Sequence, residues 1–219
     1  MNFKERLLSF KGFADQQRTE LCEIMARHGS DKGRGIHNYS KFYNFLFGDV
    51  KNKKLNVFEV GLGTNNVAIP SNMGASYNVG ASLYGWEEYF LNSNIFGADV
   101  DKGILFNKDR IQTFFVDQLD KKTINDLLDN TLKDIVFDIM IDDGLHQFVA
   151  NHNFLINSIH KLKTDGVYII EDVFDEIILK FNDVFTREFC EQHKIKTVRV
   201  VKLDHPSNTF DNNLIVILK

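Results

Sequence analysis

Short runs of β-branched and aromatic residues alternate along the chain with longer segments in which apolar residues recur at helical intervals. The β-rich runs predict strands at residues 55–60, 95–100, 111–116, 137–141 and 167–170. This alternation is typical of a parallel sheet whose strands are joined by crossover helices. It therefore predicts an α/β fold with helices on both faces of the sheet.

Helical periodicity appears between these runs and ahead of the first one. The predicted crossover helices lie at residues 82–91, 123–132, 149–162 and 175–192. Before the sheet, apolar positions over residues 3–27 predict one or two further helices, which the segment 29–35 ends. We therefore expect an N-terminal helical extension, residues 1–50, ahead of the main domain, residues 51–219.

The end of the chain departs from this alternation. Residues 198–203 and 214–218 are both β-rich, and the stretch between them is too short for a crossover helix. Parallel neighbours need such a crossover, so these two strands should be antiparallel. The prediction is a Rossmann-like, seven-stranded, mostly parallel sheet with an antiparallel last strand.

Composition narrows the class of protein. The 219 residues are 43% hydrophobic and 26% charged and include 20 phenylalanines, which predicts one folded domain with a large core. Formal charge is −4, with no basic block, so we expect a small polar acceptor and no nucleic acid. No segment has the length and apolar content of a membrane span, and the two cysteines lack metal-site spacing, so we expect a cytoplasmic protein.

The first predicted strand runs into a glycine-containing loop, Glu59-Val-Gly61-Leu-Gly63. Glycines there let the backbone approach a ligand at the carboxyl end of the strand. A dinucleotide fingerprint needs a third glycine where Asn66 stands, and Asp99, the next acid at a strand end, lies 40 residues beyond Glu59. Both features argue against a binding site for a nicotinamide cofactor. The alternative is that the two glycines only shape a tight turn.

The second and third strands also end in polar residues. Asp99 could accept hydrogen bonds from both hydroxyls of a ribose, whereas Asp101 is better suited to cap a helix. Asp117 and Gln118 could hydrogen-bond the edge of an adenine. The alternative for any single Asp after a strand is a structural Asx turn.

The fourth strand gives the strongest local signal, because Asp142 and Asp143 are adjacent carboxylates at its exit. Such a pair is unfavourable unless a cation or a shared proton offsets the charge. His146, three residues beyond Asp143, could act as a general base near neutral pH. The alternative is that Asp142 faces solvent and His146 opens the next helix.

Glu171 and Asp172 follow the fifth strand, which can lie beside the fourth. Asp143, Glu171 and Asp172 could then converge as hard oxygen ligands for Mg²⁺ or a similar ion. A divalent ion would orient an acceptor hydroxyl and lower its pKa while His146 takes the proton.

The N-terminal region adds a second polar cluster. His28-Gly-Ser-Asp-Lys-Gly33 is followed by His37-Asn-Tyr39, and Tyr39 and Tyr43 would share one face of a helix. The segment could close over a cofactor as a lid. Equally, the tyrosines could be ordinary packing between elements.

Together these strings resemble one family. The sequence from His28 to Val173, including Glu59-Val-Gly-Leu-Gly-Thr-Asn-Asn, Gly80-Ala-Ser-Leu-Tyr-Gly-Trp, Ile141-Asp-Asp-Gly-Leu-His and Glu171-Asp-Val, is similar to the macrocin and mycinamicin sugar O-methyltransferases and their relatives in surface-polysaccharide clusters. The order and spacing of the motifs carry the resemblance. The stretch after Val173 has no matching motif, so the acceptor pocket is the part least defined by sequence.

The resemblance implies a class I methyltransferase that uses S-adenosylmethionine and Mg²⁺ and assembles as a homo-oligomer. It implies that Asp143 and His146 are catalytic and that Asp143, Glu171 and Asp172 hold the metal. The residues implied to contact the cofactor are Tyr39, Glu59, Gly61, Gly63, Ser82, Asp99, Asp117, Gln118 and Asp142. Two other functions stay open from the residues alone: a nicotinamide-dependent oxidoreductase and a non-catalytic partner that keeps the fold.

Overall fold

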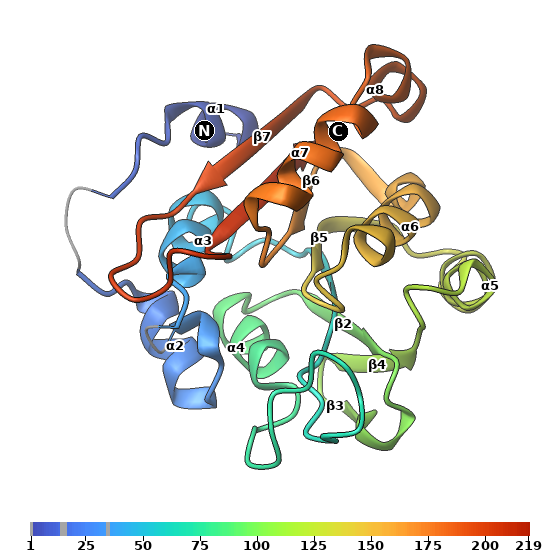
Figure 1. The fold of residues 1–219 in the computed structure, drawn as a ribbon. Helices are drawn as coiled ribbons and strands as arrows, with labels where there is room; N and C mark the ends of the chain where they lie inside the picture. The colour runs from blue at the N-terminus through green and yellow to red at the C-terminus, as the bar shows by residue number, and fades with distance from the viewer. Residues whose placement is uncertain (1, 14–16, 34–35) are drawn as a thin grey trace.

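One mixed sheet organises the chain in a computed structural model that describes residues 2–13, 17–33 and 36–219 (Figure 1). Its strand order is β3-β4-β2-β1-β5-β6-β8-β7. The strands are β1 (Asn56–Val60), β2 (Asn94–Asp99), β3 (Asn107–Lys108), β4 (Ile111–Phe115), β5 (Phe137–Asp142), β6 (Leu162–Ile170), β7 (Thr197–Lys202) and β8 (Asn213–Leu218).

The strand directions confirm the predicted topology. Strands β4, β2, β1, β5 and β6 are mutually parallel, and β8 runs antiparallel to both β6 and β7. The sheet has eight strands and not seven, because the two-residue strand β3 pairs with β4 in antiparallel fashion. A two-residue strand is too short to leave a periodic pattern in the sequence.

Helices cover both faces of this sheet, as predicted. They are α1 (Phe3–Ser9), α2 (Glu20–His28), α3 (Tyr39–Phe47), α4 (Ala81–Tyr89), α5 (Lys121–Asn125), α6 (Phe148–Ser158), α7 (Asp175–Val184) and α8 (Arg187–His193). The helical segment predicted at 123–132 continues from α5 as a π-helix, η3 (Asp126–Thr131). The helix predicted at 175–192 is broken, because the Thr186 hydroxyl accepts a hydrogen bond from the Phe189 amide and starts α8 as a new helix.

Successive strand residues enter two different cores, as the two-residue period of a strand requires. Val57 and Ile95 pack with Leu7, Tyr43 and Trp86 on the face that α1 to α4 cover. Their neighbours Phe58 and Phe96 pack on the opposite face, with α6 and α7. Figure 1 shows α2, α3 and α4 on one side of the sheet and α5 and α6 on the other.

The N-terminal helices are therefore part of the core of the sheet. Gly29 ends α2 in a left-handed conformation, as the sequence predicts, and residues 14–16 and 34–35 of the predicted N-terminal segments lie outside the described residues. Within the described ranges, no helix has both the length and the apolar content needed to span a membrane.

Candidate active site

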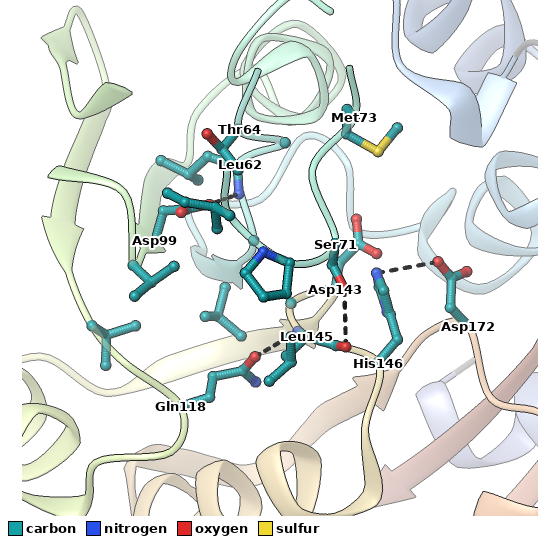
Figure 2. A pocket seen from close by; sticks show the side chains of 18 of the residues that line it. Leu62, Thr64, Ser71, Met73, Asp99, Gln118, Asp143, Leu145, His146 and Asp172 are labelled. Carbon is teal, nitrogen blue, oxygen red and sulfur yellow. Dashed lines mark hydrogen bonds and ion pairs between the residues drawn. The ribbon is translucent and has the colours of Figure 1, made fainter. Parts of the chain in front are cut away.

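A cavity of about 320 Å³ opens where the parallel strands end (Figure 2). Gly61 follows β1, Asp99 ends β2, Gln118 follows β4 and Asp143 follows β5, and all four line it. Figure 2 shows Asp99 and Gln118 at one end of the cavity and His146 and Asp172 at the other. This is the edge at which open α/β sheets bind their ligands.

The two glycines of the first loop are required by close packing. Gly61 has a φ of +95°, and a Cβ there would lie 1.9 Å from the carbonyl oxygen of Asp143. Gly63 has a φ of +73°, and its Cβ would meet the ring of Tyr77 at 2.3 Å. Both residues line the cavity, yet their missing side chains make room for protein atoms. The glycines therefore shape the turn, which is the alternative interpretation of this motif, and they also expose its backbone to the cavity.

Asp99 is held rigidly at the cavity wall. Its Oδ2 accepts a hydrogen bond from the Leu62 amide and its Oδ1 accepts one from the Asp101 amide, both at 2.8 Å. Burial raises the pKa of Asp99, while these amides oppose the rise. Each oxygen keeps a further lone pair, so the carboxyl group can still accept ribose hydroxyls. Asp101 caps the short 3₁₀ turn η2 (Lys102–Ile104), as predicted.

The predicted adenine contacts are largely engaged within the protein. Asp117 Oδ1 accepts from the Leu119 amide at 2.9 Å, which is the Asx turn considered as the alternative. The Gln118 amide donates to Asp142 Oδ1 at 2.7 Å and accepts from the Leu145 amide at 2.8 Å. Both side chains still line the cavity.

Asp142 and Glu59, two of the predicted cofactor contacts, are not among the residues that line the cavity. Both are fully buried, so the alternative of a solvent-facing Asp142 is also wrong. Burial raises the pKa of Asp142 to about 6 and that of Glu59 to about 7. The Glu59 carboxyl group accepts hydrogen bonds from Ser82 and Trp86, because the strand period directs it toward α4. Ser82 does line the cavity.

A buried lysine from the N-terminal region joins the acidic residues. Lys32, in the 3₁₀ turn η1 (Asp31–Gly33), is 2% exposed, and its Nζ contacts Asp143 Oδ2 and lies 2.7 Å from Glu171 Oε2. The same Nζ lies 3.9 Å from Glu59 Oε1. Burial alone would lower the pKa of Lys32, but the carboxylates around it raise it well above its ordinary value. Lys32 therefore stays an ammonium at the centre of this cluster.

Helix α3 supplies two tyrosines to the same acids, so the predicted shared face of Tyr39 and Tyr43 is confirmed. Tyr43 donates to Glu171 Oε1 at 2.6 Å, and Tyr39 donates to Asp172 Oδ1 at 2.8 Å. Both tyrosines are completely buried, which agrees with the packing alternative and not with a lid. Tyr39, a predicted cofactor contact, thus supports Asp172 and is not among the residues that line the cavity.

The residues that could bind a metal ion differ in part from the three predicted ligands, Asp143, Glu171 and Asp172. One ligand atom each from Asp143, His146 and Asp172 lie within 4.8 Å of one another. Glu171, the third predicted ligand, is 1% exposed and has its two oxygens engaged by Lys32 and Tyr43. It could join the ligand set only by releasing one of these partners.

His146 does not open the next helix, which begins at Phe148 after the N-cap Gln147. It sits in a left-handed conformation, φ +55°, with its Nε2 3.5 Å from Asp172 Oδ2. Its Nδ1 is buried and has no hydrogen-bond partner among the described residues. The imidazole is therefore placed at the cavity with one ring nitrogen directed toward the acids.

The charge balance of the cluster favours a bound cation. Lys32 carries one positive charge against four carboxyl groups, those of Glu59, Asp143, Glu171 and Asp172. Burial and the mutual repulsion of the acids raise the pKa of Glu171 and Asp172, although Lys32 opposes this. Carboxylate oxygens are the preferred ligands of Mg²⁺ and Mn²⁺, and an imidazole nitrogen suits first-row transition ions. The residues present therefore fit a divalent metal.

Sequence reasoning missed two residues of this site. Lys32 belongs to the His28–Gly33 motif, but its partners lie more than 100 residues away along the chain. Tyr77 comes from the segment after β1 that also brings Ile69, Pro70 and Met73 to the cavity. That segment has no periodic pattern, so hydrophobic periodicity does not predict that it lines the cavity.

The fold is that of the class I methyltransferases. Over 93% of this chain and 55% of the other, it matches MycE, a methyltransferase of the mycinamycin pathway solved with Mg and SAH, at a TM-score of 0.68 and 21% identity. A second structure of MycE, which also contains mycinamycin VI, matches equally well. No model of a known protein family matches the chain.

Curated relatives of the chain are sugar O-methyltransferases, the class of protein that its motifs resemble. The chain is 30% identical, over 153 residues, to 8-demethyl-8-alpha-L-rhamnosyl tetracenomycin-C 2'-O-methyltransferase of Streptomyces olivaceus, covering 70% of this chain and 37% of the relative. It is 28% identical over 161 residues to demethylmacrocin O-methyltransferase of Streptomyces fradiae, covering 71% and 36%. Mycinamicin VI 2''-O-methyltransferase of Micromonospora griseorubida is 27% identical over 161 residues, with 72% and 37% covered. The chain spans little more than a third of the length of these relatives.

Proposed function

We propose that the chain is an S-adenosylmethionine-dependent methyltransferase that methylates a hydroxyl of a sugar, a nucleotide-sugar or a related polar metabolite. The observation that carries the proposal is one cavity with Asp99 at one end and the Asp143, His146 and Asp172 group at the other. The named activities of the sugar O-methyltransferase relatives support it. Among the described residues that line the cavity, no feature favours a nicotinamide cofactor.

The cofactor would lie along the strand ends. Asp99 accepts the ribose hydroxyls, the backbone of Gly61 and Gly63 borders the chain that carries the sulfur, and Asp117 with Gln118 borders the adenine. When bound, S-adenosylmethionine supplies an electrophilic methyl group, and a divalent cation supplies positive charge close to the acceptor oxygen.

The residues at the other end of the cavity act on the acceptor. Asp143 and Asp172 would hold the cation. His146 would take the proton of the acceptor hydroxyl at Nε2 as the acceptor oxygen bonds to the methyl carbon and the bond between that carbon and the sulfur breaks, which releases S-adenosylhomocysteine. Lys32 and Tyr43 hold the Glu171 carboxyl group in place, and this fixes the positions of the neighbouring acidic side chains. Alignment of the nucleophile with the methyl group supplies much of the remaining acceleration.

The wider setting follows from the same proposal. We place the activity in the cytoplasm, in surface-polysaccharide or secondary-metabolite biosynthesis, because both cysteines are free thiols and the acceptor is a small polar molecule. We also propose a homo-oligomer, in which residues 1–50 carry the N-terminal cofactor motif and residues 51–219 form the methyltransferase domain. Analytical ultracentrifugation tests the oligomer, and a single monomeric species would contradict it.

Calorimetric titration with S-adenosylhomocysteine tests the function directly. We expect saturable one-to-one binding by the full chain and at least tenfold weaker binding by Asp99→Asn, because the neutral amide is a poorer acceptor for two hydroxyls. Folded protein that gives no heat with this ligand would contradict the proposal. NADH binding of comparable strength would favour the oxidoreductase alternative instead.

A further inference from the structure

A second cavity, of about 690 Å³, lies at the loop that joins β7 to β8, residues 203–212. Its walls include Asp175, Lys202, Asp204, His205, Asn208 and Phe210. Strand β8 starts beside the end of β6, with Ile215 opposite Ile170. The loop therefore emerges at the same edge of the sheet as Asp172, and Figure 1 shows it next to α3.

Hydrogen bonds join this loop to the acid cluster. The Tyr39 hydroxyl lies 2.8 Å from Asp172 Oδ1 and 2.9 Å from the carbonyl oxygen of Asp211. The side-chain amide of Asn213 donates to the Val173 carbonyl at 2.7 Å. One hydroxyl group thus separates the loop from a proposed metal ligand.

The loop is also fixed in shape by the segment before α3. Asn38 donates to the Asp204 carbonyl at 2.8 Å, and Asn208 donates to the Ile36 carbonyl at 3.2 Å. Asn212 donates to the Leu203 carbonyl at 2.8 Å, which closes the base of the loop. A cavity whose walls are held in this way is preformed, as small-molecule sites usually are.

One wall of the cavity is an exposed aromatic ring. Phe210 is 71% exposed and is the only one of the 20 phenylalanines, all of which lie in the described ranges, that is exposed. Its ring stacks on Phe174 with centroids 5.4 Å apart and an interplanar angle of 16°. Phe174 covers one face of Phe210 and leaves a flat apolar surface among polar side chains.

We propose that this second cavity binds the pyranose ring of the acceptor, with Phe210 as its stacking platform. A pyranose has an apolar C–H face that packs on an aromatic ring, and hydroxyls around its edge that hydrogen-bond to carboxylates such as that of Asp204, which lines the cavity. The Tyr39 hydroxyl, which contacts both Asp211 and Asp172, lies between this subsite and the proposed metal site. This inference rests on the proposed methyltransferase function and locates its acceptor subsite.

Saturation-transfer NMR with the full chain tests the subsite. The probes are the methyl pyranosides of rhamnose, glucose, galactose and mannose, each titrated into protein saturated with S-adenosylhomocysteine. We expect at least one to bind, Phe210→Ala to weaken it about tenfold, and Phe210→Trp to retain it, because alanine removes the stacking surface whereas tryptophan preserves one. Leu179→Ala, which trims a side chain on α7 that is 66% exposed, is the matched control and should bind as the wild type does.

The outcomes separate the subsite from the function. If S-adenosylhomocysteine binds but no pyranoside does, or if Phe210→Ala binds pyranosides as tightly as the wild type, the subsite proposal is wrong and the methyltransferase proposal stands. If S-adenosylhomocysteine itself fails to bind the wild type, both proposals fail. Unchanged affinity for S-adenosylhomocysteine in each variant shows that the variant is folded.

Discussion

Replacing Lys32 by methionine should strongly destabilise the protein, because it removes the cation that faces Asp143, Glu171 and Glu59. Methionine is also long and unbranched, so most of the packing of the stem is kept. Removing one partner of a buried ion pair costs about 3–5 kcal/mol, because the charge left behind has no compensation. For a chain of this size, that loss lowers the melting temperature by roughly 6–20 °C.

The loss should depend on pH in a defined direction. Burial already raises the pKa of Glu59 to about 7, with Lys32 acting to lower it, so without Lys32 the acids bind protons more readily still. Protonation relieves their repulsion in the folded state. We therefore expect Lys32→Met to lose less stability at pH 5 than at pH 8.

Thermal unfolding followed by circular dichroism at both pH values measures the effect. Lys122→Met is the control, because Lys122 is 80% exposed and its surface pair with Asp126 is screened by solvent, so its removal should change stability very little. A Lys32→Met variant as stable as Lys122→Met at pH 8, or one with equal losses at pH 5 and pH 8, would refute this account of Lys32.

Other changes probe the proton acceptor, the first loop and the buried acids. His146→Ala should lower kcat by about 10²- to 10⁴-fold in a methyl-transfer assay, with little change in the calorimetric affinity for S-adenosylhomocysteine. The control His160→Ala, at an exposed ion pair with Asp129, should change neither quantity. Equal kinetics for the two variants would show that His146 takes no part in the reaction. Gly61→Ala should destabilise the protein by roughly 2–4 kcal/mol in urea unfolding, because the new Cβ would meet the Asp143 carbonyl. The control Gly74→Ala, at φ +82° with nothing within 4 Å, should cost only about 1 kcal/mol of backbone strain. Similar losses of stability for both variants would contradict the packing argument. With divalent ions chelated, wild-type stability should fall as pH rises from about 4.5 to 7, because the pKa of Glu59 is raised on folding and the folded state binds the extra proton. Glu59→Gln should flatten this dependence of stability on pH. An unchanged slope would show that Glu59 does not titrate in this range.

The positions of the strand ends could be predicted from sequence, and the directions of several side chains could not. Asp99, Asp143 and Asp172 reach one cavity because parallel strands present their carboxyl ends at one edge. The motif places Glu59 at the same edge, although the strand period turns its side chain toward α4. Counting that period from Phe58, which packs on the opposite face, would have revealed this.

Contacts made at long range account for most of the remaining differences. Glu171 is held behind the cavity by Lys32, a residue 139 positions earlier in the chain. No local pattern encodes such a contact, because it depends on how the N-terminal helices pack on the sheet. For the same reason, the hydrogen bonds from Tyr39 to Asp172 and from Tyr43 to Glu171 could not be predicted from the sequence.

A crystal structure of the full chain with S-adenosylhomocysteine and Mn²⁺ tests the central claim most directly. The anomalous signal of Mn²⁺ should appear between Asp143 and Asp172, with the ribose hydroxyls on Asp99 in the same cavity. Mn²⁺ bound away from both carboxylates, or S-adenosylhomocysteine bound outside the cavity, would contradict the claim that one site holds the cofactor and the metal together.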